Sequence, residues 1–278
     1  LYVNEEFQGV YELCEQCQIN PNRVDISEPE EGYTDIDIGY YLELDNYATS
    51  DEDNHYISMD YENATVTDIN GETRQFVPAE YSIKNDLYSQ NQIDFIDKYL
   101  NNLFKIVYEA CENGKYYKFD ENYDLVDSDV TTAEEAVSNV MDIDSVRDMY
   151  ILYEIVHDYD CGEGSFYMCV DLSKDSKCPK LKFTSPWDFN WAYNDSTEKY
   201  YAGAFTDKNF VAKKGDRSNP WFIILCKQDW FMDAVKEKWT EMSQEKLLQG
   251  CIKTEREYLK EYDADLRKGE EWGPDSAE

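Results

Sequence analysis

Apolar residues recur with helical spacing in several stretches of this chain and with strand-like spacing in others. The clearest helical stretch covers residues 89–112, where large apolar side chains recur three or four positions apart behind the candidate N-cap Ser89. Further helices are predicted to begin at or near Thr132, Asp144, Pro220, Asp229 and Gln244. The helix that Asp144 is expected to cap ends near His157.

Strand-like stretches dominate the first third of the chain. A β-hairpin is predicted over residues 1–18, with Tyr2-Val3 and Val10–Leu13 on either side of a polar turn. Other predicted strands cover residues 39–45, 165–171 and 180–184, and residues 116–129 are predicted to form a second hairpin or an extended loop. This order predicts an α+β fold with one domain over 1–278, divided into a β-rich part (1–88) and a mostly helical part (89–278).

The chain has 278 residues and is strongly acidic, with 60 Asp and Glu against 26 Lys and Arg and a formal net charge of -34. Nucleic acid is excluded as a partner because its phosphates would be repelled. A 42 % content of hydrophobic residues nevertheless indicates a globular protein. No apolar run reaches membrane-spanning length, so membrane insertion is not expected. Nothing in the sequence indicates the oligomeric state.

Eight cysteines are too few for a disulfide-stapled small protein of this length. Cys14 and Cys17 form a lone CxxC pair, and the two histidines of the chain offer little to complete a structural zinc site. Cys169 and Cys178 are spaced to pair across the predicted hairpin, although buried free thiols remain the simpler interpretation. The aromatic content of 15 % leaves open a carbohydrate-binding module as a further alternative.

Two aspartates stand in unusual settings. Asp160 follows the helix that ends near His157 and leads into the extended run from Ser165. Asp188 lies in the segment Trp187-Asp188-Phe189-Asn190-Trp191, just after the next predicted strand. An acid after a helix, a hairpin and a second acid beside aromatic residues is a layout that holds Mg²⁺ and a nucleotide phosphate.

Four segments carry a resemblance to a known family: residues 1–16, 22–26, 150–160 and 186–190. Together they resemble the CotH-type protein kinases, a family named for spore coat protein H. The segments 219–221 and 229–231 resemble the downstream helical part of that family. Because the sequence opens within a strand, we expect it to be N-terminally truncated. The family's first strands and a phosphate-binding basic residue would precede Leu1.

The resemblance implies an atypical protein-kinase-like, two-lobed fold that transfers phosphate from ATP to Ser or Thr of a protein, with Mg²⁺ as cofactor. It implies a catalytic role for Asp160 and metal binding by Asp188 and Asn190. Glu15 and Ser165 would contribute to cofactor binding. It also implies an extracellular or cell-surface protein, and the acidic surface favours a basic protein substrate.

Each of these roles has a simpler alternative. Asp160 and Asp188 would otherwise be solvated loop acids, and Glu15 a charge on a strand face. Asn190 stands where family members usually have a second aspartate, which favours a non-catalytic pseudokinase. Such a protein would serve as a structural component of a cell surface or a cellulosome.

Overall fold

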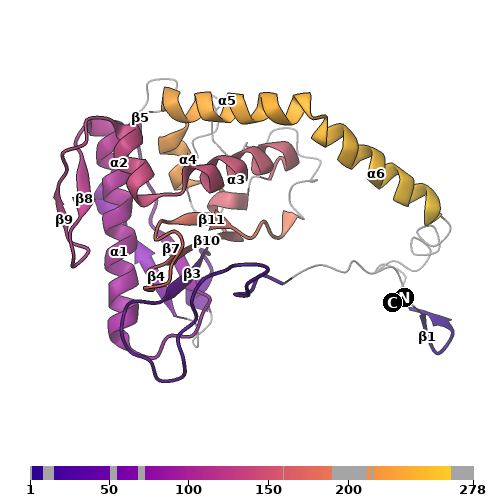
Figure 1. Ribbon diagram of the computed structural model, residues 1–278, viewed down its shortest axis with the longest axis horizontal. Helices are drawn as coiled ribbons and strands as arrows, with labels where there is room; N and C mark the ends of the chain where they lie inside the picture. Colours follow the sequence, from indigo (N-terminus) through magenta and orange to yellow (C-terminus); the bar gives the residue numbers. More distant parts are fainter. Residues whose placement is uncertain are drawn as a thin grey trace. The chain divides into compact units, whose positions relative to one another are not determined.

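The computed structural model describes residues 2–8, 16–50, 55–67, 73–158, 160–189, 212–213 and 216–263 (Figure 1). The chain forms two compact units. One comprises Cys17–Val235, and the other comprises Leu1–Gln16 together with Lys236–Glu278. Both aspartates singled out above belong to the first unit, so its core is what positions them.

A five-stranded antiparallel sheet forms the centre of the first unit, in the order β11-β10-β3-β7-β4. Its strands are β3 (Gly39–Leu44), β4 (Tyr56–Met59), β7 (Ala79–Ile83), β10 (Phe166–Asp171) and β11 (Lys182–Thr184). All six residues of β3 are buried, as expected for a central strand. The sheet therefore takes strands from both the N-terminal and the C-terminal part of the chain.

The remaining strands pair in short antiparallel hairpins: β1 (Tyr2–Val3) with β2 (Glu6–Phe7), β5 (Thr65–Thr67) with β6 (Thr73–Gln75), β8 (Tyr117–Phe119) with β9 (Leu125–Asp127), and β12 (Ala212–Lys213) with β13 (Asp216–Arg217). The first hairpin is tighter than predicted, because Asn4 and Glu5 adopt left-handed conformations that turn the chain back at once. The predicted return strand Val10–Leu13 lies outside the described residues.

The helices within the described residues are α1 (Gln90–Tyr108), α2 (Ala133–Val140), α3 (Ile143–Val156), α4 (Pro220–Leu225), α5 (Asp229–Gln244) and α6 (Leu247–Glu261). Short helical segments lie at η1 (Ala48–Ser50), η2 (Tyr61–Asn63), η3 (Glu109–Asn113, a single turn of π-helix) and η4 (Asp160–Gly162). Helix α1 packs against α2 and β4, and α3 packs against β11. None of the helices described is both long and apolar enough to span a bilayer.

Helix α1 begins where the sequence predicts. Ser89 is its N-cap and forms a capping box with Gln92, whose side chain accepts from the Ser89 backbone N–H at 3.2 Å. Gln92 is fully buried, and its amide also donates to the carbonyls of Tyr33 and Asp35, which offsets the cost of burying it. One side chain thus caps the helix and anchors the loop before β3 to it.

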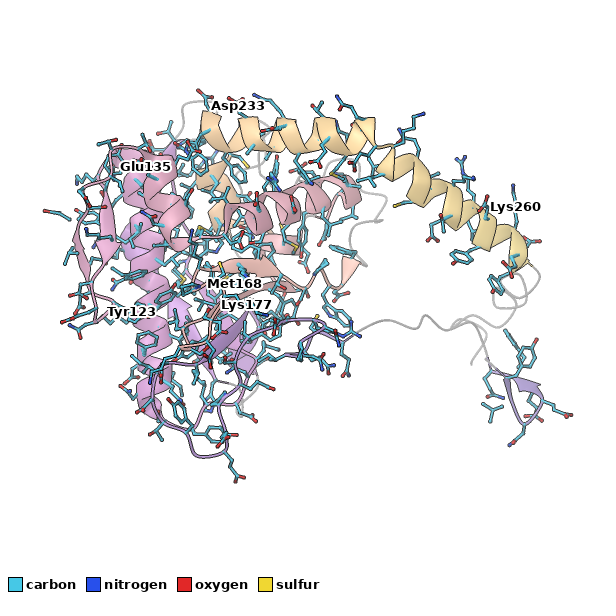
Figure 2. The ribbon with its side chains drawn as sticks, viewed as in Figure 1. Tyr123, Glu135, Met168, Lys177, Asp233 and Lys260 are labelled. Carbon is cyan, nitrogen blue, oxygen red and sulfur yellow. The ribbon has the colours of Figure 1, made fainter. Side chains whose placement is uncertain are left out.

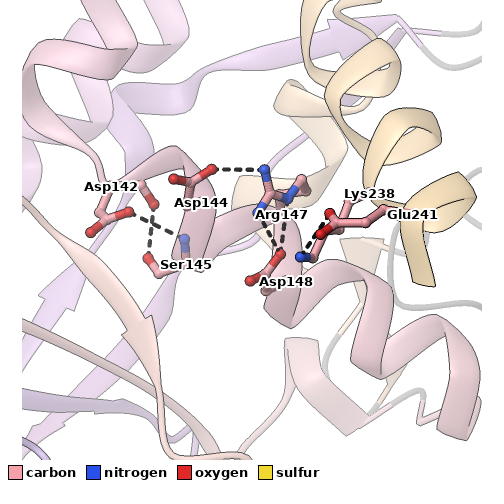
Figure 3. Close-up of polar contacts among 7 residues, drawn as sticks. All are labelled: Asp142, Asp144, Ser145, Arg147, Asp148, Lys238 and Glu241. Atoms are coloured by element: carbon pink, nitrogen blue, oxygen red, sulfur yellow. Dashed lines mark hydrogen bonds and ion pairs between the residues drawn. The ribbon is translucent and has the colours of Figure 1, made fainter. Parts of the chain in front are cut away.

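Helix α3 begins two residues earlier than predicted. Asp142, not Asp144, is the N-cap, and its carboxylate accepts the Ser145 backbone N–H at 3.2 Å (Figure 3). The backbone N–H of Asp142 donates to the carbonyl of Leu181, which holds the chain extended up to that point. Asp144 lies in the first turn and pairs with Arg147 at 2.7 Å. A long-range contact therefore decides which of two nearby acids caps the helix.

An aromatic core joins the sheet to helix α4. The ring of Phe166 lies 4.9 Å from that of Phe183 and 5.6 Å from that of Phe222, both edge-on. The indole N–H of the fully buried Trp221 donates to the Tyr81 hydroxyl at 3.3 Å. Buried aromatic pairs of this kind each add about 0.5–1.5 kcal/mol beyond the burial of their surface.

The described elements confirm a mixed α+β architecture, with a strand-rich N-terminal part and a helical C-terminal part. The predicted division at residue 88 and the two-lobed arrangement stay predictions. Helix α5 ends at Gln244, and Lys246 adopts a left-handed conformation before α6 begins. The final helix therefore starts three residues later than its predicted start at Gln244.

Candidate functional site

Asp160 opens the short helical turn η4, which follows α3 and leads into β10. Its backbone N–H donates to the carboxylate of Asp158 at 3.2 Å. Its carbonyl accepts the N–H groups of Glu163 and Gly164 at 2.7 and 3.1 Å. The main chain on both sides of Asp160 is therefore held by short-range hydrogen bonds, so the half-buried carboxylate projects from a defined turn.

Two buried asparagine amides hold the same turn from distant parts of the chain. Asn46, just after β3, donates to the carbonyls of Gly162 and Glu163 at 3.3 and 3.0 Å. Asn219, the N-cap of α4, donates to the carbonyl of Cys161 at 2.9 Å. Three successive carbonyls after Asp160 are thus anchored by side chains that are 3 % and 0 % exposed. Such buried contacts are costly to break, so the turn is rigid.

The carboxylates of this turn lie in an environment that disfavours their charge. Burial, followed by the charges of Glu163 and Asp188, raises the pKa of Asp160 from 3.8 to about 6. Burial also raises the pKa of Asp158 to about 6, against the backbone hydrogen bond from Asp160 and together with the charges of Asp160 and Asp188. The negative charge of Asp188 therefore acts on both acids, although Asp188 lies beyond the β10–β11 hairpin.

A pair of aromatic rings links the two ends of that hairpin. Phe189, directly after Asp188, packs edge-on against Tyr153 of α3 with ring centroids 5.4 Å apart. The Tyr153 hydroxyl in turn donates to the carbonyl of Ser165 at 3.4 Å, just before β10. Since α3 leads directly into the Asp160 turn, this contact brings the two predicted acids into one neighbourhood. The sequence hypothesis of two converging aspartates is compatible with this arrangement.

Left-handed backbone conformations gather around the same hairpin. His157, Ser165, Ser185 and Asp188 have φ values of 58°, 54°, 50° and 59°. Each costs about 1 kcal/mol or more for a residue other than glycine, and such residues cluster at functional sites. His157 is the C-cap of α3, and its left-handed conformation ends the helix. The segment that carries Asp158 and Asp160 follows directly.

The residue before Asp188 packs onto an apolar cluster on the sheet. Trp187, half-buried, contacts a cluster formed by Val24, Tyr41, Tyr167 and Cys169. The Tyr41 hydroxyl donates to the Ser185 hydroxyl at 2.8 Å, which fixes the chain between β11 and Trp187. Asp188 itself is exposed and therefore accessible to a solute.

The structure describes only some of the predicted site residues. Ser165 is half-buried, and its carbonyl, rather than its hydroxyl, has a hydrogen bond to Tyr153. Glu15 and Asn190 lie outside the described residues, so their positions relative to Asp188 are not part of the description. The roles assigned to these three residues stay predictions.

The two predicted acids fit a magnesium ion in their chemistry. No group of three or more His, Cys, Asp or Glu side chains among the described residues is arranged to hold a metal by itself. Mg²⁺ commonly takes only one or two protein carboxylates and completes its shell with water and substrate phosphates. Asp160 and Asp188 meet that requirement, because their charges repel each other and a divalent cation would relieve the repulsion.

The cysteines that the structure describes are free thiols, at positions 17, 111, 161, 169, 178, 226 and 251. The alternative of a bond between Cys169 and Cys178 is therefore not seen. Burial raises the pKa of the Cys161 thiol well above its usual value, with smaller contributions from the charges of Asp158, Glu154 and Asp160. A buried thiol of this kind is a packing residue beside the site rather than a nucleophile.

Sequence reasoning missed Asn46, Asn219 as a contact of the turn, and Glu163. Glu163 is buried, and its carboxylate accepts the Asn46 amide at 3.3 Å. No local pattern reveals such contacts, because the partners are 58 to 117 residues apart in sequence. Their one visible signal is a polar residue at a predicted boundary: Asn46 after a strand and Asn219 before Pro220.

Comparisons with the curated proteins and with the solved structures give no match. A family model described as CotH kinase protein matches residues 1–268, which include all the segments that carry the resemblance noted from sequence. Membership of a kinase family implies ATP as phosphate donor and suggests a protein as the acceptor. Because the match covers nearly the whole sequence, the chain belongs to the CotH kinase protein family.

Proposed function

We propose that this protein is an ATP- and Mg²⁺-dependent phosphotransferase that acts on Ser or Thr side chains of a protein. The observation that carries the proposal is electrostatic: burial is the largest cause of the raised pKa of Asp158 and of Asp160, and the charge of Asp188 adds to it at both acids across the β10–β11 hairpin. The Phe189–Tyr153 contact supports the same convergence. Two acids near each other on rigid supports are what phosphoryl transfer requires, because catalysis here is mostly positioning and charge neutralisation.

Each of the predicted site residues has a distinct role in this reaction. Asp160 orients the acceptor hydroxyl and takes its proton on a carboxylate oxygen, for which a pKa near the working pH is suitable. Asp188 holds Mg²⁺, assisted by Asn190 and Ser165, and Glu15 helps to bind the nucleotide. When bound, Mg²⁺ neutralises charge on the transferred phosphate. The hydrogen bonds from Asn46 and Asn219 to the turn after Asp160 hold the backbone that carries this carboxylate before the substrate binds.

Transfer of labelled γ-phosphate to a Ser/Thr-containing protein acceptor tests the proposal. Asp160→Asn and Asp188→Asn should each reduce transfer at least about a hundredfold, in line with the loss of a catalytic acid or base. Asp127→Asn on the exposed strand β9 is a matched control that should retain full transfer. Undiminished transfer by Asp160→Asn in a folded protein would remove its catalytic role.

The alternative is a pseudokinase that serves as a structural component of a cell surface or a cellulosome. It is favoured by Asn190, which offers a neutral carbonyl where the family usually has a carboxylate. Thermal unfolding with Mg-ATP separates the two, because a ligand that binds only the folded state raises Tm. A rise in Tm with Mg-ATP supports the enzyme, and an unchanged Tm supports the pseudokinase.

We further propose that the protein acts outside the cell or at its surface and that its substrate is basic. The chain's formal charge of -34 would attract cationic segments and repel acidic ones. Transfer to paired peptides that differ only in Lys and Glu content measures this preference. Equal rates at low ionic strength would contradict it, because screening is weakest there.

A further inference from the structure

A cavity of about 300 Å³ lies beside the turn of the β10–β11 hairpin. Its lining comes from the segment before β3, from one face of the neighbouring strands β10 and β11, and from the turn between them. Four of the lining residues are cationic: Arg23, Lys177, Lys180 and Lys182. This concentration of positive charge is unusual in a chain with a net charge of -34. The volume is at the lower end of the range for small-molecule sites.

Three acids also line the cavity: Asp25 and Asp171 are engaged with other groups, and Asp175 is exposed to solvent. The carboxylate of Asp171 accepts the backbone N–H and the hydroxyl of Ser27 at 3.3 and 3.4 Å, and the backbone N–H of Ser173 at 3.0 Å. Asp25 pairs with Lys177 at 3.0 Å. Both side chains of that pair are exposed, so the ion pair is weak. The ammonium group of Lys177 is therefore able to bind another anion. Lys177 is labelled in Figure 2.

Lys182 is a cation of the cavity lining whose positive charge is not neutralised by an ion pair within the described residues. It is half-buried on β11 directly opposite Cys169 of β10, and both residues line the cavity. Its ammonium group has no ion pair or hydrogen bond with the described part of the chain, whereas Lys180 donates to the Ser138 carbonyl at 2.6 Å. Burial raises the pKa of the Cys169 thiol to about 12, and the positive charge of Lys182 opposes that rise. The ammonium group therefore lies near the cavity wall at Cys169.

We propose that this cavity binds a phosphate group carried as a monoester. A monoester brings a charge of about -1.5 to -2 and three acceptor oxygens, which suits several converging cations better than a single carboxylate does. The guanidinium of Arg23 and the hydroxyls of Ser176 and Thr184 supply further donors along the lining.

The cavity is separate from the two acids of the candidate active site. Asp160 precedes β10 and Asp188 follows β11, so both lie at the open end of the hairpin. The lining of the cavity extends from the turn at the other end along β10 as far as Cys169 and along β11 as far as Thr184, and it includes neither acid. The site proposed here does not depend on the kinase proposal, and either can fail alone.

Calorimetric titration of the full chain with O-phosphoserine at low salt tests the proposal. We expect one saturable site, weakened about tenfold or more by Lys182→Gln because a charged hydrogen bond is lost. Lys174→Gln is the matched control, since Lys174 lies on the same turn but is 90 % exposed and does not line the cavity. If Lys182→Gln fails to fold, judged by its circular dichroism, Arg23→Gln provides the second test with the same expectation.

Other ligands identify the source of the phosphate and can overturn the proposal. Tighter binding of a phosphoserine tripeptide than of phosphoserine supports a site for a modified protein segment, and equal binding supports one for a small phosphate ester. Binding of glutamate as tight as that of phosphoserine would overturn it, as would equal effects of Lys182→Gln and Lys174→Gln. Displacement of phosphoserine by Mg-ATP would also overturn it, because the cavity would then belong to the nucleotide site.

Discussion

Replacing Asp160 with asparagine should make the protein more stable at neutral pH while it reduces phosphate transfer at least about a hundredfold. The pKa of Asp160 is raised from 3.8 to about 6, so the folded state disfavours the charged carboxylate. The folded protein therefore loses stability as the pH rises from about 4 to about 6, and the loss is complete above that range. Asparagine keeps the shape of the side chain and removes the charge, so this loss disappears.

The size of the effect follows from the pKa. The interval from 3.8 to about 6 sets an upper limit of about 3 kcal/mol on the increase in the free energy of unfolding that the substitution can cause. Because the side chain is only half-buried, screening by solvent reduces this to about 1–2 kcal/mol. In a protein of this size each kcal/mol moves Tm by about 2–4 °C, so Tm should rise by about 2–8 °C.

Thermal unfolding at pH 7.5 and at pH 4, combined with a phosphate-transfer assay, measures both effects. The gain in Tm should be present at pH 7.5 and nearly absent at pH 4, where the wild-type carboxylate is mostly protonated in the folded state. Asp127→Asn, an exposed acid on β9, should change Tm at neither pH. A lower Tm at pH 7.5, or an equal gain at both pH values, would refute the reasoning about charge.

Three further predictions concern the metal, the turn and a close backbone approach. Mg²⁺ alone should raise Tm more at pH 7.5 than at pH 5, because it competes with protons for acids whose pKa is about 6. Asn219→Ala should lower the free energy of unfolding by about 2–4 kcal/mol in urea, since it removes the cap of α4 and the bond to Cys161. Gly39→Ala should cost about 1–3 kcal/mol in the same assay, because its Cβ would lie 2.6 Å from the Ser27 carbonyl oxygen.

Each of these has a control. Asp188→Asn should lose the response to Mg²⁺, and an unchanged response would exclude Asp188 as a ligand. Asn219→Ser keeps an N-cap but is too short to reach Cys161, so it should lose activity with a smaller loss of stability than Asn219→Ala. Full activity in Asn219→Ser would show that the bond to Cys161 does not position the turn. Gly250→Ala in α6, where a Cβ meets nothing within 4 Å, should not destabilise the protein.

Local patterns in the sequence predicted most of the helices and the principal strands. Ser89 as the cap of α1, Pro220 at the start of α4 and the β10–β11 hairpin all follow from short-range preferences, and each is present. The start of α3 was misplaced because Asp142 and Asp144 are equally suitable caps by local chemistry. The hydrogen bond from Asp142 to Leu181 decides between them.

The sequence also supplied the family, the two candidate acids and their order along the hairpin, because those depend on residue type and spacing alone. It did not indicate what holds the Asp160 turn in place. Asn46 and Asn219 form their hydrogen bonds to that turn only after β3 and α4 have packed beside it. The charge of Asp188 affects the pKa of Asp160 only after the hairpin has folded. Caps and periodicity are encoded within a few residues, whereas burial, long-range hydrogen bonds and shared electrostatic fields exist only when distant segments meet in the folded chain.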